Sequence, residues 1–398
     1  MSTGPGRLPC PACEDTAAQP LVAMAGVPVM CGVLWGTQAE ALGAARGDIE
    51  LVACTRCSLL RNAAFDEALV DYEGNYDNSL HFSPTFQRYA DGLARRLVGR
   101  YGLRGGTVVE IGSGKGDFLR ALCELGDNRG WGYDPAYTGE QAGADDRVTF
   151  VPDYFSHETA AALPARPDLV CARHVLEHMT DPAPLLATVR RAAGPSTVLY
   201  LEVPDAAYVL TPPGLWDLIY PHVGYYTATA LRHVAVRAGF APLEVASSFG
   251  GQYLWVEARG SDAPAAGPTP EPPADEVEAV LAVASGFADM HRKTVAGWAD
   301  QLAEAADRGT RMALWGAGTK GATFLNVVPG AADIASVVDV NPRKRGRYVP
   351  GTGHEVWSPG DLVAEPPDVV LVMNSLYEDE IRRTLADLGL DDTTVSVV

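Results

Sequence analysis

The chain has 398 residues, of which 47% are hydrophobic and 20% are charged. This length suggests two or three domains, and the composition excludes a disordered or fibrous chain. The net charge of −19, from 31 basic and 50 acidic side chains, has the wrong sign for binding a nucleic-acid backbone. Nucleic acid is therefore not expected as a partner.

The N-terminus and the cysteine content indicate the compartment. The first residues, MSTGPGRLPCPAC, lack the apolar segment of a secretory signal, and seven cysteines are too few for a disulfide scaffold. No segment approaches the ~18 uninterrupted apolar residues of a membrane span. We therefore expect a cytoplasmic protein without membrane contact.

Two CxxC pairs lie near the start of the chain. In a reducing compartment such pairs indicate one tetrahedral zinc site with four thiolate ligands, closed and structural rather than catalytic. A small β-structured insert, residues 21–33 and 49–53, is expected between the pairs. The alternative is four unrelated buried thiols. The predicted ligands are Cys10, Cys13, Cys54 and Cys57, whereas Cys31, Cys123 and Cys171 are expected in the core.

From about residue 72 the pattern alternates between strands and helices, which predicts a doubly wound parallel sheet. Apolar runs at 107–111, 130–133, 167–171 and 197–201 are the predicted strands. Helical spacing of apolar residues covers 86–101 and 117–125. The fold class is therefore α/β, with a central doubly wound sheet.

The first of these strands ends in VVEIGSGKGDF, which carries a glycine-rich loop into a helix. Glycine allows a tight turn and a close approach of the ligand to the backbone. An acid before the first glycine and a second acid at the end of the next strand favour S-adenosylmethionine over a dinucleotide. The predicted cofactor-binding residues here are Glu110, Gly112, Ser113, Gly114, Lys115, Gly116 and Asp134, with Asp153 placed for the adenine amine.

The run LVCARHVLEHMTDP leaves the third predicted strand, where ligands of such sheets are bound. Arg173 and His174 are expected beside the cofactor. His178 is a candidate acid or base, because imidazole titrates near neutral pH. A metal on His174 and His178 is not expected, because no third ligand with matching spacing follows. Either histidine can instead be a satisfied structural residue.

The C-terminal third begins after a Pro- and Ala-rich linker at residues 261–273. A helix is expected over 275–307, then the run RMALW and a glycine loop at 316–321. Further strands at 336–342 and 368–374 and a helix at 377–388 complete a smaller Rossmann-like unit. Lys320, Arg343 and Lys344 are predicted to bind a diphosphate. The alternative is a solvated basic turn.

Several motifs together resemble the three-domain sugar C-methyltransferases. They are the four cysteines, EIGSGKGDF, HVLEHMTDP, EVPD, IYPHVGYYT and LWGAGTKGATFLN with VVDVNPRKRGRYVPGTG. The resemblance implies methylation at C3 of a nucleotide-linked 4-keto deoxysugar, with S-adenosylmethionine as methyl donor. It also implies that a base removes the C3 proton, that the substrate lies between the central and C-terminal domains, and that the C-terminal loop binds no nicotinamide.

One motif departs from that family. The family reads Tyr-x-Glu-His, whereas this chain reads Tyr220-Pro221-His222 and lacks the glutamate. His222 is the candidate base and Tyr220 the group that polarises the ketone. Glu202, predicted to face the substrate, or another acid then replaces the missing carboxylate, or the substrate is not a 4-keto sugar. Tyr76 is the match for a catalytic tyrosine after the zinc domain, with Tyr72 and His81 as rivals, and Tyr225 and Tyr226 are as readily core residues.

The sequence thus predicts a small zinc-binding β domain at 1–71 and an S-adenosylmethionine-binding domain with a class I methyltransferase sheet at 72–260. A linker and helix at 261–306 and a Rossmann-like substrate domain at 307–398 are expected to follow. The expected function is C-methylation of a nucleotide-linked keto deoxysugar by a monomer or homodimer. An O- or N-methyltransferase acting on another small metabolite would explain the missing glutamate. A ligand-binding protein without catalysis, and an NAD-dependent oxidoreductase, are weaker alternatives.

Overall fold

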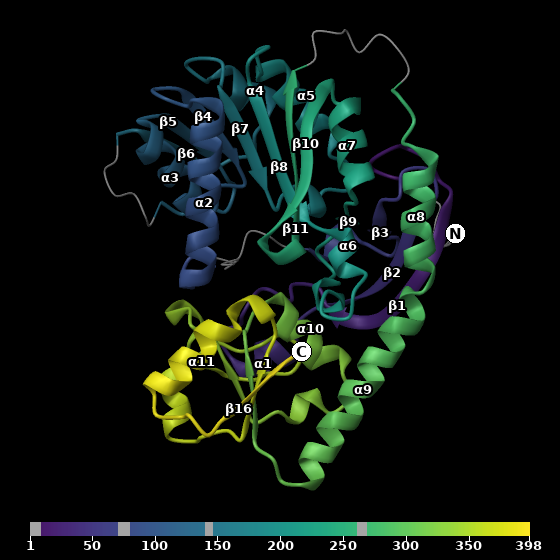
Figure 1. Cartoon of the computed structure of the whole chain (residues 1–398), viewed down its shortest axis with the longest axis vertical. Coiled ribbons are helices and arrows are strands. Elements are labelled where there is room, and N and C mark those ends of the chain that lie inside the picture. Colours follow the sequence, from purple (N-terminus) through teal and green to yellow (C-terminus); the bar gives the residue numbers. More distant parts are fainter. Residues whose placement is uncertain (1–8, 71–79, 140–145, 261–268) are drawn as a thin grey trace.

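The computed structural model describes residues 9–70, 80–139, 146–260 and 269–398. Within these parts the chain forms three sheets, arranged as a methyltransferase unit above a smaller C-terminal unit, with the N-terminal strands beside both (Figure 1). None of the helices in these parts is both long and apolar enough to span a membrane.

The N-terminal sheet is antiparallel, and its four strands follow the order β1-β2-β3-β9. Its last strand comes from the central part of the chain, so the two regions share one sheet. The strands are β1 (Ala18–Pro28), β2 (Arg46–Cys54), β3 (Leu60–Asn62) and β9 (Gly224–Tyr225), with the short helix α1 (Gln38–Leu42) between β1 and β2.

The central sheet has the order β10-β11-β8-β7-β4-β5-β6. Five strands are parallel, whereas β11 pairs antiparallel with both β8 and β10, so the prediction of a parallel sheet was wrong for this edge. The strands are β4 (Thr107–Ile111), β5 (Arg129–Tyr133), β6 (Val148–Val151), β7 (Leu169–Arg173), β8 (Val198–Pro204), β10 (Phe240–Ser248) and β11 (Tyr253–Gly260).

Helices cover both faces of the central sheet (Figure 1). The longest of them, α2, begins where the Ser83 hydroxyl accepts hydrogen bonds from two backbone N–H groups, and ends at Gly102 in the left-handed conformation. The helices are α2 (Pro84–Tyr101), α3 (Asp117–Gly126), α4 (His157–Ala161), α5 (Ala183–Ala192), α6 (Ala206–Val209) and α7 (Ala228–Arg237), and the 3-10 turns are η2 (Leu176–His178), η3 (Leu215–Asp217) and η4 (Phe249–Gly251).

The C-terminal unit is a parallel five-stranded sheet of order β14-β13-β12-β15-β16, as a Rossmann-like domain requires. The helix expected over 275–307 is divided at Gly286 into α8 and α9, since glycine is a poor helix former. The elements are α8 (Ala274–Ser285), α9 (Phe287–Asp307), β12 (Met312–Trp315), α10 (Thr319–Val327), β13 (Ser336–Val338), β14 (Val356–Trp357), β15 (Val369–Val372), α11 (Glu378–Asp387) and β16 (Thr394–Val397).

One apolar core joins the N-terminal and C-terminal units. It is built around Trp216, which is fully buried and whose ring lies 5.0 Å from that of Phe324 in α10. Trp298 of α9 contacts the same phenylalanine at 5.6 Å. These contacts link three segments that are distant in the sequence, so one core crosses the predicted domain limits. The limits themselves stay a prediction.

The C-terminal unit is also fixed against the central sheet by polar contacts. The side-chain amides of Gln252 and Asn374 exchange two hydrogen bonds of 2.8 and 2.9 Å. The Ser83 hydroxyl at the start of α2 donates to Glu380 in α11. The first contact joins the turn before β11 to the carboxyl end of β15. Ligands of α/β sheets bind at the carboxyl ends of the strands, so the contact lies at this edge of the C-terminal sheet.

Candidate active site

The four predicted zinc ligands lie together beneath β2. Their sulfurs are 3.6 Å apart for Cys10 and Cys57 and 3.5 Å apart for Cys13 and Cys54, all four within 4.8 Å of one another, and all four residues are buried. A tetrahedral zinc with Zn–S bonds of about 2.3 Å separates its sulfurs by roughly 3.8 Å. The cluster therefore fits one zinc ion. Cys31, Cys123 and Cys171 are buried elsewhere, as predicted, and none of the seven cysteines is in a disulfide.

The glycine-rich loop lies between β4 and the first turn of α3. Gly112, Gly114 and Gly116 all have positive φ, at 70°, 52° and 82°. A Cβ on Gly116 would lie 2.1 Å from the Phe150 ring, so only glycine fits there. The loop thus leads directly into the N-terminus of α3, and the N-terminus of a helix favours a carboxylate or phosphate.

The acids predicted around this loop are brought to one edge of the sheet. Asp134 accepts hydrogen bonds from the backbone N–H groups of Gly114 at 2.7 Å and Ala136 at 2.8 Å. Glu110 is buried, one of its oxygens has no hydrogen-bond partner, and burial raises its pKa to about 8. The buried Ser113 hydroxyl also lacks a partner. These unsatisfied polar atoms support a polar ligand on the loop.

The remaining cofactor-binding predictions lie around the same edge. Asp153 is exposed and follows β6, the neighbour of β5, where its carboxylate accepts from the N–H of Tyr154. Lys115 is half-buried within the loop. Arg173 is nearly buried at the end of β7, with its guanidinium 4.4 Å from the centre of the Phe118 ring. The loop residues therefore fit S-adenosylmethionine, and their individual contacts to it stay predictions.

Glu202 lies inside a polar network rather than at an open surface. Its side chain is fully buried, and one oxygen pairs with Arg173 Nε at 2.8 Å. The other oxygen accepts from the hydroxyls of Tyr200, at 2.7 Å, and Tyr89. Arginine holds the pKa of this carboxyl below its usual value despite burial. Since both oxygens are occupied, the geometry does not support the predicted contact with substrate.

His174 stands at the carboxyl end of β7 in a strained backbone conformation. Its φ is 54°, a region that non-glycine residues rarely occupy. Its Nδ1 lies 3.3 Å from Glu177 and its Nε2 lies 3.6 Å from Glu202, and the side chain is 32% exposed. The ring packs edge-on against Tyr253 at 4.5 Å. His174 thus connects two buried carboxylates with the surface.

The two candidate bases, His178 and His222, meet as predicted. Their ring centres are 4.9 Å apart and the rings are nearly perpendicular. His178 Nδ1 lies 3.0 Å from the Pro221 carbonyl oxygen, whereas the buried His222 Nδ1 has no hydrogen-bond partner. Burial lowers the pKa of both imidazoles, that of His222 more strongly because charge on His178 and His174 adds to the effect. Both rings are therefore neutral and able to accept a proton at neutral pH.

A third group at this site was missed by the sequence reasoning. Glu177 is fully buried, and one of its oxygens and one ring nitrogen from each of His178 and His222 lie within 4.8 Å of one another. The signal was present in HVLEH, where a glutamate adjoins the predicted base. Its relation to His222, on a distant loop, requires the tertiary structure.

Tyr220 does not face this site. Its hydroxyl accepts a hydrogen bond from the Asp66 N–H at 2.8 Å and donates to the Asp66 carbonyl oxygen at 3.3 Å, and its ring packs on Phe65. The side chain is thus used to attach the loop to the N-terminal sheet, and the prediction that it polarises a ketone is not supported. Tyr225 donates to backbone carbonyls and is buried, which agrees with a core role.

The predicted catalytic Tyr76 and its rival Tyr72 lie outside the described residues. The second rival, His81, is described. Its Nδ1 lies 2.8 Å from the Gln87 side-chain oxygen, and its ring packs against Phe86 at 5.2 Å. His81 is therefore engaged with the start of α2.

The predicted phosphate contacts in the C-terminal unit are already engaged. Lys320 Nζ pairs with Asp217 at 2.7 Å, and Lys344 Nζ pairs with Asp339 at 2.8 Å. Asp339 also accepts from the Ala317 N–H in the glycine loop. Arg343 lies over the Phe82 ring at 5.3 Å.

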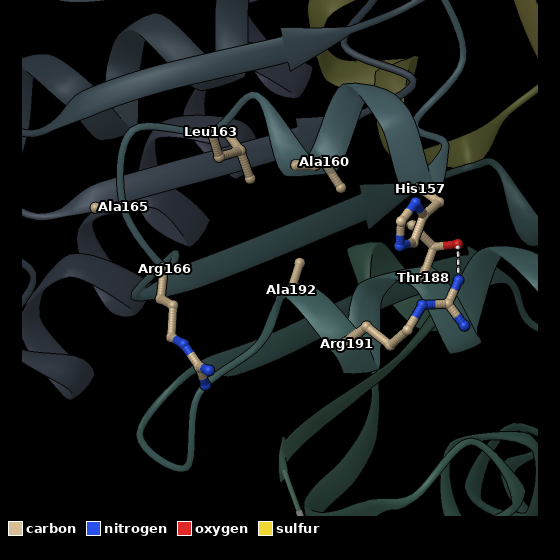
Figure 2. A pocket seen from close by; sticks show the side chains of 9 residues that line it. His157, Ala160, Leu163, Ala165, Arg166, Thr188, Arg191 and Ala192 are labelled. Carbon is tan, nitrogen blue, oxygen red and sulfur yellow. Dashed lines mark hydrogen bonds between the residues drawn. The ribbon is translucent and has the colours of Figure 1, made fainter.

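A surface pocket lies away from these groups, between α4 and α5. Figure 2 shows His157, Arg166 and Arg191 around an opening lined otherwise by alanine, leucine and threonine side chains, with a volume of about 370 Å³. Arg191 is directed back to the Thr188 hydroxyl, to which it donates at 3.0 Å. None of the predicted site residues lines this pocket.

Comparisons with known proteins agree with the geometry. A methyltransferase domain model matches residues 83–245, and a C-methyltransferase C-terminal domain model matches residues 274–395. The chain is 26% identical to the C-methyltransferase NovU of Streptomyces niveus over 385 residues, which cover 94% of this chain and 90% of NovU.

Solved structures resemble less than half of the chain. The 1,6-didemethyltoxoflavin-N1-methyltransferase of Burkholderia thailandensis is 21% identical, with a TM-score of 0.34, over 44% of this chain and 78% of that one. The magnesium protoporphyrin IX methyltransferase of Synechocystis PCC 6803 is 19% identical, with a TM-score of 0.36, over 47% and 90%. The two domain matches and the match to NovU together show that the chain belongs to the S-adenosylmethionine-dependent C-methyltransferases.

Proposed function

We propose that this enzyme methylates a carbon atom next to the ketone of a nucleotide-linked keto deoxysugar. The observation that carries the proposal is the pair of neutral imidazoles, His178 and His222, whose rings meet 4.9 Å apart near the carboxyl edge of the methyltransferase sheet. A carbon atom next to a ketone becomes a nucleophile only after a base removes its proton. Oxygen and nitrogen atoms already carry a lone pair that can attack the methyl group. Similarity to NovU, named a C-methyltransferase, supports the same reaction.

The residues divide the work as follows. S-adenosylmethionine supplies an electrophilic methyl group on its sulfonium sulfur when bound. The loop of Gly112, Gly114 and Gly116 holds the cofactor's polar end, and Asp134 faces its ribose. One imidazole of the His178/His222 pair accepts the C3 proton of the sugar, leaving the C–H electrons in an enolate. Holding this carbon about 3 to 3.5 Å from the methyl group then supplies much of the rate.

Zinc on the four cysteines has a structural role in this proposal. All four ligand positions are filled by sulfur, so no position remains for substrate or water. The ion holds the turn before β3, and β3 pairs with β9, which follows His222 by only one residue. The metal therefore stabilises the loop that carries the proposed base.

Proton exchange tests the proposed chemistry. The candidate keto deoxysugar is incubated in heavy water with enzyme and S-adenosylhomocysteine, and C3 deuteration is followed by NMR. We expect exchange that depends on the enzyme and that is lost in His222→Ala, with S-adenosylhomocysteine binding retained. Absence of exchange with the wild-type enzyme, together with methyl transfer to oxygen or nitrogen, would assign the protein to the O- or N-methyltransferases that the missing glutamate favours.

A further inference from the structure

Glu177 is a buried carboxylate without hydrogen-bond donors. The residue has 0% exposure, and neither of its oxygens accepts a hydrogen bond. A buried carboxylate in this state is strongly destabilising unless a cation can form beside it. The groups nearest to it that can become cationic are histidines: His174 Nδ1 lies 3.3 Å from Oε1, and a nitrogen of both His178 and His222 lies within 4.8 Å.

The surroundings of Glu177 are otherwise neutral. Burial raises the pKa of Tyr225 and Tyr226, and the negative charge of Glu177 adds to this effect, so both remain protonated phenols. Arg173 is directed to Glu202, whose nearest contact with this group is through His174 Nε2 at 3.6 Å. The carboxylate of Glu177 can therefore stabilise a positive charge on any of three imidazoles. Two belong to the proposed base, His178 and His222, and the third is the partly exposed His174.

His174 provides the outward side of this arrangement. Its side chain is 32% exposed, whereas Glu177 is fully buried. The unusual φ of 54° is maintained by a hydrogen bond from the His174 N–H to the Glu202 carbonyl oxygen at 2.8 Å and by the Tyr253 ring. Backbone strain of this kind costs about 1 to 3 kcal/mol and is retained where geometry serves function. It places the imidazole between Glu177 and the surface.

We propose that Glu177 carries the abstracted proton from the His178/His222 pair to His174, and so takes the place of the glutamate missing before His222. This inference rests on the proposed function, because it requires that a base removes a carbon-bound proton. Once methyl transfer has consumed the enolate, the imidazolium gives its proton to one oxygen of Glu177. Rotation of the carboxyl group then presents this same proton to His174 Nδ1, and the protonated His174 releases one proton to solvent. Glu177 ends as the carboxylate and the base as neutral imidazole.

Glu177→Gln tests the relay, since it preserves shape and cannot cycle a proton. We expect one methyl group per active site to be transferred at near the wild-type rate, followed by turnover about 100-fold slower, the lower range of a positioned acid–base group. C3 deuteration from heavy water slows by a similar factor. Glu257→Gln is the matched control, because Glu257 is equally buried but pairs with Arg96 and Arg100 on another part of the sheet. It should show no burst.

His174→Asn tests the outer step and does not depend on Glu177→Gln folding. Asparagine tolerates positive φ, so the backbone can keep its conformation. We expect the same burst and slow turnover, and restoration by added imidazole because the position is partly exposed. In Glu177→Gln, S-adenosylhomocysteine affinity should stay within about twofold of wild type.

The outcomes are distinguishable. If Glu177→Gln exchanges and turns over like wild type, the relay is wrong while base catalysis stands. If wild-type enzyme shows no C3 exchange, the proposed function fails first. If cobalt titration reveals a second bound ion beyond the four-cysteine site, and that ion is lost in Glu177→Gln, the three groups form a metal site and the relay is overturned. A burst in both variants with imidazole rescue supports the relay.

Discussion

Removing one of the four predicted zinc ligands tests how far this cluster supports the proposed base. The Cys57→Ala change deletes one of four converging sulfurs. Three residues later β3 begins, and its Leu60 and Arg61 pair with Tyr225 and Gly224 of β9. The Ser58 side chain also bonds that of Thr227 at 2.8 Å. The loop carrying His222 is thus attached directly to the turn that carries Cys57 of the cysteine cluster.

The expected magnitude follows from these contacts. Structural zinc contributes about 10 to 16 kcal/mol in small domains, which is as large as the whole stability of an ordinary domain, about 5 to 15 kcal/mol. Loss of the ion should therefore disorder the N-terminal sheet. The two β3–β9 pairs and the Ser58–Thr227 bond, at about 1 kcal/mol each, are then lost as supports of the His222 loop. About 3 kcal/mol corresponds to more than a hundredfold decrease in the population of the correct loop conformation.

The cofactor loop lies on β4 and α3, in a different sheet, and should survive the change. We therefore expect zinc content near zero, methyl transfer reduced at least a hundredfold, and S-adenosylhomocysteine affinity by calorimetry within a few-fold of wild type. Cys31→Ala is the matched control, since Cys31 is equally buried but outside the cluster, and it should keep both zinc and activity. A folded, zinc-free Cys57→Ala enzyme with normal turnover would refute the reasoning.

Four further predictions follow from the same contacts. Tyr220→Phe should lower the free energy of unfolding by about 0.5 to 1.5 kcal/mol in urea and leave kcat unchanged, because its hydroxyl bonds only the Asp66 backbone; a large loss of kcat at normal stability would return Tyr220 to the chemistry. Gly116→Ala would place a Cβ 2.1 Å from Phe150, so it should lower the free energy of unfolding by about 1 to 3 kcal/mol and weaken S-adenosylhomocysteine binding at least tenfold in calorimetry. Gly99→Ala, with open space at its Cβ, is the control and should bind normally. Lys320→Met removes the ion pair with Asp217 and should lower the free energy of unfolding in urea by about 1 to 2 kcal/mol. The KM for a nucleotide sugar should not change. A tenfold rise in KM at normal stability would instead support phosphate binding. Burial lowers the pKa of His178 and His222, so folding favours their neutral forms. The free energy of unfolding should therefore be highest above the unfolded pKa of about 6.5 and fall below it by up to about 1.4 kcal/mol per pH unit and proton. Replacing His222 by Gln should reduce that slope, and an unchanged slope would contradict the assignment.

Features that depend on neighbours in the chain could be predicted from the sequence. The CxxC pairs correctly identified four converging sulfurs, because ligand spacing within each turn is local. The cofactor loop and β4 were placed accurately, since a buried parallel strand followed by glycines leaves few alternatives. Strands β10 and β11 were not predicted. In β10 most residues are at least partly exposed, and no continuous apolar run marks the strand. In β11 the mostly buried run YLWV was a usable signal that the prediction missed.

The sequence by itself determined that a methyltransferase sheet, a cysteine cluster and a second Rossmann-like unit are present, because local periodicity, glycine conformations and ligand spacing encode them. Only the tertiary structure decided what the charged and polar side chains contact. Asp217 and Asp339 occupy the two lysines predicted to bind phosphate, and Tyr220 turns to the N-terminal sheet. The tertiary structure also brings Glu177 close to His222, whose own loop lacks a carboxylate at the motif position. Apart from Lys344 and Asp339, which are close along the chain, these pairings join residues that are distant in the sequence, so no local pattern determines them. Burial of charged and polar groups makes their pairing energetically important.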